Sequence, residues 1–384
     1  MKKLNANLVI DLGNSETRVL VQSGKTKSGL IRQQLGTISN KFVTVEEGYE
    51  IPENYDEDNT IVFETPEGEF FANGLLVERE YESMSVRPTA IEQKQDSKVT
   101  MLTLQRAFFE GFRLLAKMNL TDIESLDVTW NVSILLPPNS VERGSKVLYE
   151  KIMGINEFTY ILPEVTLNIN VERVRFFPEG FAAYIATLMR RGKVLNEEFT
   201  HLLQSKTLIV DLGAGTTDFF VVDGMETIES TKSTIKVGGN DVSSTIRQEL
   251  IKQDIVLPES VVTKGVQEGF IKDGALKIPL GKNIVIASKN TANKLISEII
   301  SYLEGTSMSI RTIENLLVVG GGSLKSEVEG VEPLSHYIIE RLKSFAPNIQ
   351  LVGLPKEYKG EDPTSKEINP RLLNILGAGI LSEG

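Results

Sequence analysis

The sequence has no cysteine and only two histidines, His201 and His336. Disulfide bonds, zinc sites with cysteine ligands, thiol nucleophiles and metal sites built from several histidines are therefore excluded. The sequence also lacks any window of about 20 apolar residues, so we predict no helix that crosses a membrane. No apolar stretch of signal-peptide length follows the N-terminal lysines, because Asp11 interrupts it. Together these absences predict a cytoplasmic protein that does not bind membranes.

The sequence also has no excess of basic over acidic residues. The 41 Lys and Arg are outnumbered by 52 Asp and Glu, which gives a net charge of −11. This balance predicts no direct binding of nucleic acid through a large basic surface, although contact with DNA through a partner stays open. The remaining composition is that of an ordinary globular protein, with 41% apolar residues. A chain of 384 residues is long enough for about two domains.

Segments with strand-like and helix-like patterns alternate along the chain, which is typical of an α/β fold with covered sheets. Apolar residues recur at helical spacing over 101–118, which predicts a long amphipathic helix. Pro178 is expected in the first turn of a second helix over 177–190, where proline is tolerated. Residues 30–76 mix short strand-like runs with an acidic loop at 46–58, and we interpret them as a small inserted subdomain with a solvated loop. Further helices are expected at 141–153, 238–252, 284–303, 335–345 and 372–381, and strands at 127–136, 316–319 and 350–352.

One motif, Asp-Leu-Gly-(x)3-Thr, occurs twice at a separation of 200 residues. Residues 8–24 align with residues 208–224, each as a strand, a glycine turn and a second strand. The identical pairs are Leu8/Leu208, Asp11/Asp211, Leu12/Leu212, Gly13/Gly213, Thr17/Thr217, Val21/Val221 and Gly24/Gly224. A shared hairpin pattern explains the apolar matches but not an Asp, a Gly and a Thr at equal offsets. We therefore infer two related halves, each opening its own sheet.

Each copy of the motif has the composition of a phosphate-binding loop. The strand delivers an Asp to its end, and the Gly allows a tight turn whose backbone amides approach an anion. Hydroxyl groups at Ser15 and Thr17, and at Thr216 and Thr217, could donate to phosphate oxygens. Because a carboxylate repels phosphate, each of the two Asp residues would need a cation between its side chain and the phosphates. The simplest such cation is hydrated Mg²⁺.

Two further glycine clusters follow. In 316–325 a predicted buried strand runs directly into three glycines, residues 320–322. A backbone without side chains there could lie against a base or ribose. The alternative is an ordinary turn between a strand and a helix. In 237–242 a Gly-Gly turn precedes a helix that Asn240 or Asp241 could cap, and Asp241 could instead meet a ribose hydroxyl. The candidate nucleotide-binding residues are Asp11, Gly13, Asn14, Ser15, Thr17, Gly213, Ala214, Gly215, Thr216, Thr217, Asp218, Gly239, Asn240, Asp241, Gly320, Gly321, Gly322 and Ser323.

In this order the loops resemble those of the actin/Hsp70/sugar-kinase ATPase superfamily. The two Asp-Leu-Gly loops look like its phosphate loops, and VVGGGSLK (318–325) looks like its adenosine motif. PEGFAAY (178–184) and ILGAGI (375–380) look like its two connecting helices, whose Ala and Gly residues permit a close, hinge-like crossing. The resemblance implies an actin/Hsp70-like fold, with duplicated RNase H-like domains flanking a cleft that holds ATP and Mg²⁺. The expected domains are 1–172 plus 368–384, with a subdomain inserted at about 30–100, and 173–367, with a helical subdomain at about 240–310.

The resemblance also assigns roles. Asp11 and Asp211 would hold Mg²⁺ through water, and Asp218 would help to set the second loop. Glu179, together with Asp211, is the catalytic candidate, because it stands where the family places the residue that orients the attacking water. A carboxylate that merely stabilises a helix N-terminus is the alternative for Glu179. In-line attack on a γ-phosphate depends on positioning and charge neutralisation, so no nucleophilic side chain is required.

Among the branches of the superfamily, the chain is most similar to the bacterial plasmid-segregation actins of the ParM/Alp type. We expect no chaperone substrate domain, no sugar-facing catalytic Asp and no terminal membrane segment. The expected function is that of an ATPase of the bacterial cytoskeleton that polymerises head to tail into dynamic filaments. The expected partners are further copies of the chain and a small DNA-binding adaptor on plasmid DNA. A non-polymerising enzyme, such as a small-molecule kinase or an exopolyphosphatase, and a nucleotide-binding scaffold are the alternatives.

Overall fold

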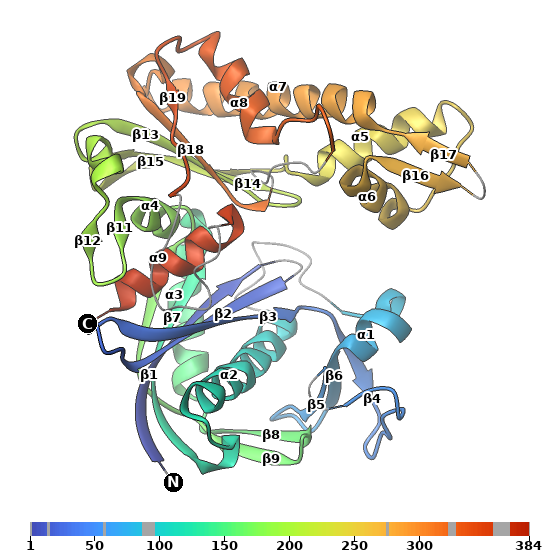
Figure 1. Cartoon of the computed structure of the whole chain (residues 1–384), viewed down its shortest axis with the longest axis vertical. Coiled ribbons are helices and arrows are strands. Elements are labelled where there is room, and N and C mark those ends of the chain that lie inside the picture. The colour runs from blue at the N-terminus through green and yellow to red at the C-terminus, as the bar shows by residue number, and fades with distance from the viewer. Residues whose placement is uncertain are drawn as a thin grey trace. The chain divides into compact units, whose positions relative to one another are not determined.

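The computed structural model describes residues 2–13, 16–56, 59–86, 97–273, 276–321, 328–355 and 369–383. These residues form two compact units. Unit 1 contains the described residues within 2–194 and 374–383, and unit 2 contains those within 195–355 and 369–373. Each unit is built on a five-stranded sheet with helices packed against it (Figure 1). Where the chain is described, none of its helices combines the length and apolarity that crossing a membrane requires.

The main sheet of unit 1 has the strand order β10-β7-β1-β2-β3. Its strands are β1 (Lys2–Leu12), β2 (Glu16–Lys25), β3 (Ile31–Ser39), β7 (Leu126–Leu136) and β10 (Asn170–Pro178). Strands β1, β7 and β10 are parallel, whereas β1, β2 and β3 are successively antiparallel. The helix predicted over 101–118 is confirmed as α2 (Lys98–Asn119), which packs on β1, β2 and β3. Helix α3 (Val141–Met153) lies against β10.

The core of unit 1 follows from the helical spacing of α2. Phe108 and Phe112 lie one turn apart on the same face, and both rings pack edge-on against Trp130 of β7, with centroids 6.4 and 5.2 Å away. All three side chains are fully or almost fully buried. Ser97 caps the helix by accepting a hydrogen bond from Val99 N. The amphipathic pattern therefore fixes which face of α2 meets the sheet.

A second sheet in unit 1 has the strand order β4-β6-β5-β8-β9. Its strands are β4 (Phe42–Val45), β5 (Thr60–Glu64), β6 (Phe70–Gly74), β8 (Glu157–Leu162) and β9 (Val165–Asn168), and β6 runs into α1 (Leu75–Glu80). The small sheet therefore differs in extent from the inserted subdomain that we predicted at about 30–100. Phe63 of β5 pairs with Tyr160 of β8, so the small sheet recruits a hairpin from far along the chain, while β3 and α2 belong to the main sheet.

The helix predicted over 177–190 is wrong at its start. Pro178 ends β10, opposite Leu136 of β7, and α4 (Phe181–Leu188) begins only after Gly180, whose φ is 72°. Strand β10 is an edge strand, where the missing N–H of proline is tolerated. Strand β10 pairs along its length with β7, and unit 1 continues to Val194, beyond residue 172, where we predicted the domain boundary. A short hairpin, β11 (Met189–Arg190) and β12 (Val194–Leu195), follows α4, and the last helix is α9 (Leu373–Ser382).

A buried carboxyl near the end of α9 predicts a pH dependence of stability. Glu383 accepts a hydrogen bond of 2.7 Å from Gly192 N. Burial raises the pKa of Glu383 from its ordinary value of 4.5, against the opposing effects of this hydrogen bond and of Arg191 and Lys193. The folded protein holds the proton of Glu383 more tightly than the unfolded chain does. The protonated carboxyl therefore contributes to stability below the pKa of Glu383 in the unfolded chain, and this contribution is lost as pH rises through the raised pKa of the folded protein.

Replacing Glu383 by glutamine keeps the acceptor and removes the buried charge. We expect Glu383→Gln to raise the urea midpoint of unfolding at pH 8 and to leave it unchanged at pH 4, where the wild-type carboxyl is protonated. An equal gain at both pH values would contradict this account.

The main sheet of unit 2 has the strand order β15-β14-β13-β18-β19. Its strands are β13 (Lys206–Leu212), β14 (Thr217–Asp223), β15 (Glu226–Ile235), β18 (Asn315–Val319) and β19 (Gln350–Leu351). Helices α7 (Gly281–Gly305) and α8 (Leu334–Lys343) share one apolar core with this sheet. The predicted helical subdomain contains α5 (Asn240–Ile251), α6 (Glu259–Glu268) and the start of α7, together with a hairpin, β16 (Phe270–Asp273) and β17 (Leu276–Pro279).

The two main sheets have the same topology. In each, a central strand pairs antiparallel with the next strand along the chain, that strand pairs antiparallel with a third, and two later strands add in parallel on the other side. The register also agrees, since Leu12 lies opposite Thr17 and Leu212 lies opposite Thr217. The duplication inferred from the repeated motif is therefore confirmed in strand order and in pairing.

Candidate functional site

Three glycine-containing loops of unit 2 line one cavity of about 500 Å³. They are the β13–β14 turn, the start of α5 and the end of β18, and the walls are completed by α6, α7 and the segment before α8. The lining residues are Gly213, Ala214, Gly239, Asn240, Val242, Ser243, Thr263, Val266, Gln267, Ile284, Ser288, Gly321, Val331, Glu332, Pro333, Leu334 and Arg371. The structure thus brings together five of the candidate residues in a volume that suits a small ligand.

Backbone hydrogen bonds hold the first two loops against each other. Gly213 O accepts from Gly239 N at 3.0 Å, and Ala214 O accepts from Asn240 N at 2.7 Å. Between them, Gly238 approaches so closely that a Cβ there would lie 2.5 Å from Ala214 O. Any side chain at position 238 would therefore push the two loops apart, which explains the glycine at this position.

The third loop passes directly over Asp211 at the end of β13. Gly320 has a φ of 82°, and a Cβ on it would lie 2.6 Å from Asp211 Oδ1. The Asp211 side chain is almost buried, with 8% of the residue exposed. A glycine is therefore required at 320 both for its left-handed backbone and for its closeness to the carboxylate.

Several candidate side chains are engaged within unit 2 in this structure. The hydroxyl of Thr217 is fully buried and donates to Val237 O at 2.6 Å, and Asp218 accepts a hydrogen bond from the Thr234 hydroxyl. These contacts fix the residues that follow the β13–β14 turn. At the tip of the turn, Ala214 and Gly215 are exposed and Thr216 is half-buried.

The capping role expected of Asn240 or Asp241 is wrong. The N-cap of α5 is Gly239, and no side chain caps it. Asp241 instead accepts a hydrogen bond of 2.9 Å from Gly238 N, outside the helix, and lies 3.5 Å from Lys294 Nζ. Both Asn240 and Asp241 belong to the first turn of the helix, so a side chain at 241 reaches back to the preceding turn rather than acting as the N-cap.

The first copy of the motif lies at the end of β1 in unit 1. Asp11 is 5% exposed, and its Oδ2 lies 3.2 Å from Arg18 Nη1. A Cβ on Gly13 would lie 2.2 Å from Glu16 O, so this turn also requires glycine. Thr17 is fully buried. The candidates Asn14 and Ser15 in this loop, and Gly322 and Ser323 after β18, lie outside the described residues.

Glu179 lies at the same edge of the unit 1 sheet as Asp11. The parallel strands β1, β7 and β10 place Asp11, Leu135 and Phe177 in one row, and Glu179 comes two residues after that row. Its backbone N donates to Leu136 O at 2.8 Å, and the N of Gly180 donates to Asn374 Oδ1 at 2.7 Å. The half-buried carboxylate therefore projects from a backbone that hydrogen bonds hold on both sides. The carboxyl edge of parallel strands is where ligands bind in open α/β sheets.

The acidic side chains of the candidate site determine whether a Mg²⁺ ion would fit there. Within the residues that the structure describes, no group of three or more acidic or histidine side chains could hold a metal ion. Asp11 and Asp211 are instead single carboxylates, each at the end of a central strand. Such residues fit a Mg²⁺ ion that keeps most of its water and binds with a phosphate ligand, rather than one caged by protein.

Sequence reasoning missed most of the cavity wall. Thr263, Gln267, Ser288 and Glu332 come from segments without a motif. Arg371 was missed too, although its Nε would lie only 3.2 Å from a Cβ on Gly321. Arg18, which pairs with Asp11 and does not belong to the cavity wall, was also missed. The sequence held one signal for it, because the alignment of the two repeats places Arg18 opposite the candidate Asp218.

Comparison with known proteins gives a consistent picture. Residues 209–329 match the family model described as archaeal actin homologue MreB-like, C-terminal. No curated protein sequence matches the chain. The structure is similar to the actin-like protein Alp7A, with a TM-score of 0.68 and 16% identity over 99% of this chain and 96% of that one. It is similar to Ta0583, an archaeal actin homologue, with a TM-score of 0.67 and 18% identity over 98% and 97% of the two chains.

A ParM protein from a 15-stranded Clostridium botulinum filament is also similar, with a TM-score of 0.61 and 15% identity over 98% of both chains. At these identities the likeness is one of fold. The family model covers the second phosphate-type loop, the start of α5 and the end of β18, and therefore most of the loops that line the cavity.

Proposed function

Because the chain has the fold of the archaeal and bacterial actin homologues, we propose that it binds ATP with Mg²⁺, hydrolyses it and assembles into nucleotide-dependent filaments. The observation that carries this proposal is the convergence of three glycine loops on the cavity in unit 2. Two similar structures support nucleotide binding, since Ta0583 has been seen in complex with ADP and a Bacillus thuringiensis ParM with AMPPNP.

In the proposed site, the cavity takes the nucleoside, with Gly239 and Gly321 offering bare backbone to it. The turn at Gly213–Thr216 presents amides and the Thr216 hydroxyl to the phosphates. Asp11 and Asp211 would hold hydrated Mg²⁺, which supplies charge neutralisation at the phosphates when bound. Glu179 would orient the water that attacks the γ-phosphate, so that the protein contributes positioning rather than covalent chemistry.

Assembly is the second part of the proposal. Contacts between unlike surfaces of successive copies generate a filament when the rotation between copies does not close a ring. Loss of the γ-phosphate would remove contacts that favour one subunit shape and so weaken the filament. The filament structure of the Clostridium botulinum ParM supports self-association. We propose that the filaments segregate plasmid DNA in the cytoplasm through a small DNA-binding adaptor.

Light scattering and phosphate release, followed together after ATP and Mg²⁺ are added to the purified protein, test this function. The proposal predicts scattering that rises with ATP and decays as phosphate appears. Phosphate release without scattering at any protein concentration would favour a non-polymerising enzyme. The absence of both scattering and phosphate release would favour a nucleotide-binding scaffold. In either of these two cases the filament proposal fails.

A side chain at position 321 tests the cavity itself. Gly321→Leu would fill part of the space beside Arg371, so we expect nucleotide affinity to fall by about tenfold or more, or about 1.4 kcal/mol. Gly353→Leu is the matched control, because Gly353 is exposed and a Cβ there meets no atom within 4 Å. Calorimetric titration with ATP measures both variants. Unchanged affinity in Gly321→Leu would place the nucleotide elsewhere.

A further inference from the structure

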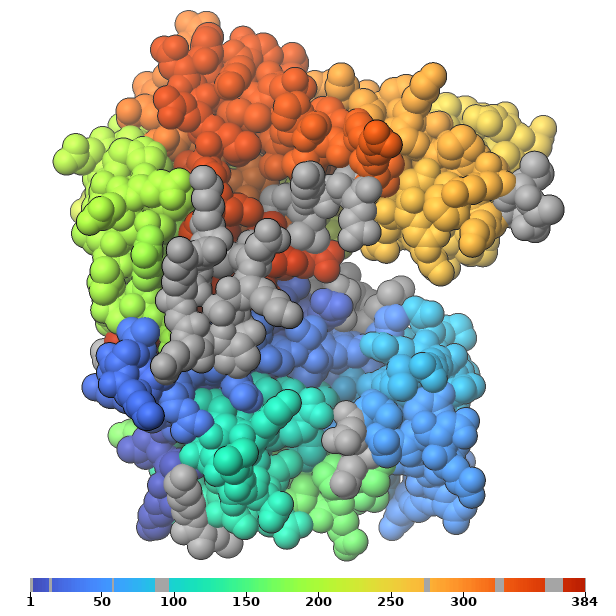
Figure 2. Space-filling model, in the orientation of Figure 1, coloured from blue at the N-terminus to red at the C-terminus, as the bar shows by residue number. Residues whose placement is uncertain are grey.

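The charge of the chain is concentrated in one segment. Residues 41–86 hold 13 of the 52 acidic residues and two of the 41 basic ones, so the remaining chain has 39 of each sign. This segment builds β4, β5, β6 and α1 of the small sheet. Figure 2 shows that the small sheet, in blue and light green, adjoins α2, in teal, on the surface of unit 1. The net charge of −11 is therefore a local property of this part of unit 1.

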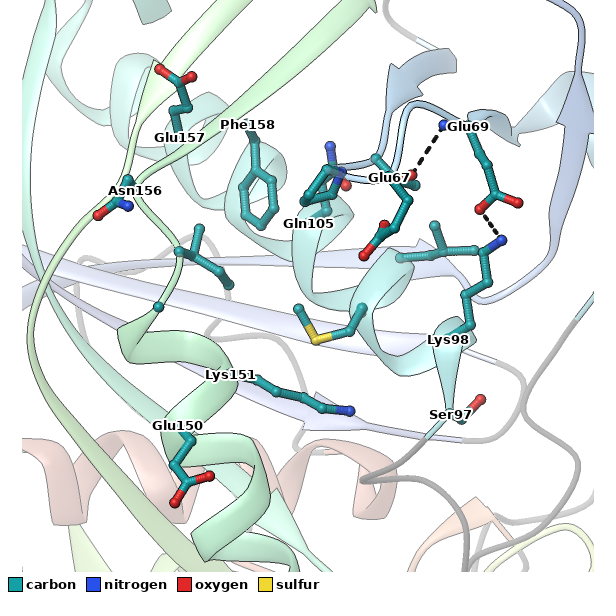
Figure 3. A pocket seen from close by; sticks show the side chains of 16 residues that line it. Glu67, Glu69, Ser97, Lys98, Gln105, Glu150, Lys151, Asn156, Glu157 and Phe158 are labelled. Atoms are coloured by element: carbon teal, nitrogen blue, oxygen red, sulfur yellow. Dashed lines mark hydrogen bonds and ion pairs between the residues drawn. The ribbon is translucent and has the colours of Figure 1, made fainter.

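Beside the acidic segment lies a groove of about 800 Å³ that none of the roles above uses. It is bounded by the β5–β6 turn, the start of α2, the end of α3 and the start of β8 (Figure 3). Its apolar floor is formed by Met101, Leu102, Ile155 and Phe158, of which Leu102 and Phe158 are buried. We name this feature the floor groove, after these four residues.

The rim of the floor groove has a net negative charge, because four glutamates line it together with two lysines, Lys98 and Lys151. Glu69 pairs with Lys98 (Figure 3). Glu67, Glu150 and Glu157 are exposed around the opening, and none of them forms an ion pair with a residue that the structure describes. An apolar floor with an acidic rim fits a segment that offers an apolar side chain between basic ones.

The start of α7 in unit 2 carries that pattern. Lys282, Ile286 and Lys289 lie at helical spacing on its exposed face, and Ile286 is 61% exposed. Lys282 has no acidic partner among the described residues, and Lys289 Nζ lies 5.8 Å from the Tyr337 ring. Residues 272–294 contain five lysines and a single acidic residue. We name Lys282, Ile286 and Lys289 the α7 stripe.

We propose that the floor groove of one copy of the chain receives the α7 stripe of a second copy. The inference rests on the self-assembly proposed above and names one of its contacts. Ile286 would enter the groove between Met101 and Ile155, and the two lysines would meet the glutamates of the rim. Because groove and stripe are different surfaces, a joined pair still has one free stripe, on the first copy, and one free groove, on the second, so further copies can add.

The opposite face of the same helix turn lines the nucleotide cavity. Ile284 and Ser288 both contact that cavity, whereas Ile286 between them points outward. A ligand that shifts the start of α7 would therefore shift the stripe as well, which gives the contact a direct route to nucleotide dependence.

Site-specific cross-linking tests the contact cleanly, because the natural chain has no cysteine. Asn156→Cys in the groove and Ile286→Cys in the stripe are introduced into separate preparations, mixed with Mg²⁺ and AMPPNP, and oxidised. We expect a disulfide-linked dimer at a yield at least about tenfold above that of a control pair, Leu120→Cys with Ile286→Cys, in which Leu120 is 94% exposed but remote from the groove lining. Equal yields in the two mixtures overturn the proposal.

A charge exchange provides the second readout. Lys282→Glu with Lys289→Glu is expected to raise the concentration needed for ATP-dependent scattering by about tenfold or more, while dilute protein still binds ATP normally. Mixing this variant with Glu150→Lys/Glu157→Lys should restore assembly. If wild-type protein assembles and neither the loss nor the rescue occurs, the contact is wrong although the filament function stands. If wild-type protein fails to assemble, the proposed function itself fails.

Discussion

Replacing Glu179 by alanine is expected to lower the rate of ATP hydrolysis by about 100-fold or more, the contribution typical of a positioned acid–base group. Nucleotide affinity should stay within about threefold of the wild-type value, because a group that acts on the attacking water contributes to the transition state and not to binding. The structural basis is the rigid placement of Glu179, whose backbone N is bonded to Leu136 O and whose neighbour Gly180 is bonded to Asn374.

Single-turnover phosphate release, with affinity measured in parallel, checks this expectation. Glu172→Ala is the matched control, since Glu172 is an exposed glutamate in β10, the strand that ends just before Glu179. It should hydrolyse ATP at the wild-type rate. Normal hydrolysis by Glu179→Ala would show that this carboxylate does not act on the attacking water. Loss of both affinity and hydrolysis would mean that it supports binding instead.

Replacing Gly377 by alanine is expected to destabilise unit 1 by about 3 kcal/mol or more, because overpacking against rigid atoms is costly. A Cβ at Gly377 of α9 would lie 1.7 Å from Ala182 O and 3.1 Å from Ala186 N, both in α4. Backbone atoms inside a helix cannot move aside as the tip of a flexible side chain can. The two helices would have to separate, which also disturbs the packing of Ala182 and Ala378 against the main sheet.

Urea unfolding followed by circular dichroism measures this loss. Gly305→Ala is the control, because Gly305 ends α7 and a Cβ there meets no atom within 4 Å. It should be neutral or stabilise the protein by up to about 1 kcal/mol, since alanine is a better helix former than glycine. A Gly377→Ala variant as stable as the wild type would contradict the close crossing of α4 and α9.

The close crossing is also the place where sequence reasoning worked best. Small residues in both segments predicted that the helices approach closely, and the distance from Gly377 to Ala182 confirms it. The repeated motif likewise predicted two equivalent hairpins, which the matching registers confirm. Both features depend on residues that only one geometry tolerates, such as a glycine at a tight approach, so the sequence carries a strong local signal.

Predictions that depended on distant pairing were less successful. Nothing local in β8 shows that it pairs with β5, about 100 residues earlier, and the subdomain predicted at about 30–100 differs from the small sheet for that reason. Pro178 is acceptable at a helix start or at the end of an edge strand, and only the pairing with Leu136 decides between them. The cavity wall at Thr263, Gln267 and Arg371 was missed because tertiary packing alone assembles it.

A crystal structure of the protein with Mg²⁺ and AMPPNP tests the central claim most directly. The account predicts density for the nucleoside in the cavity lined by Gly239, Gly321 and Arg371, with the phosphates at the turn formed by Gly213–Thr216. Density for the nucleotide at any other site, or no binding at concentrations far above those that saturate nucleotide-binding proteins, would contradict it.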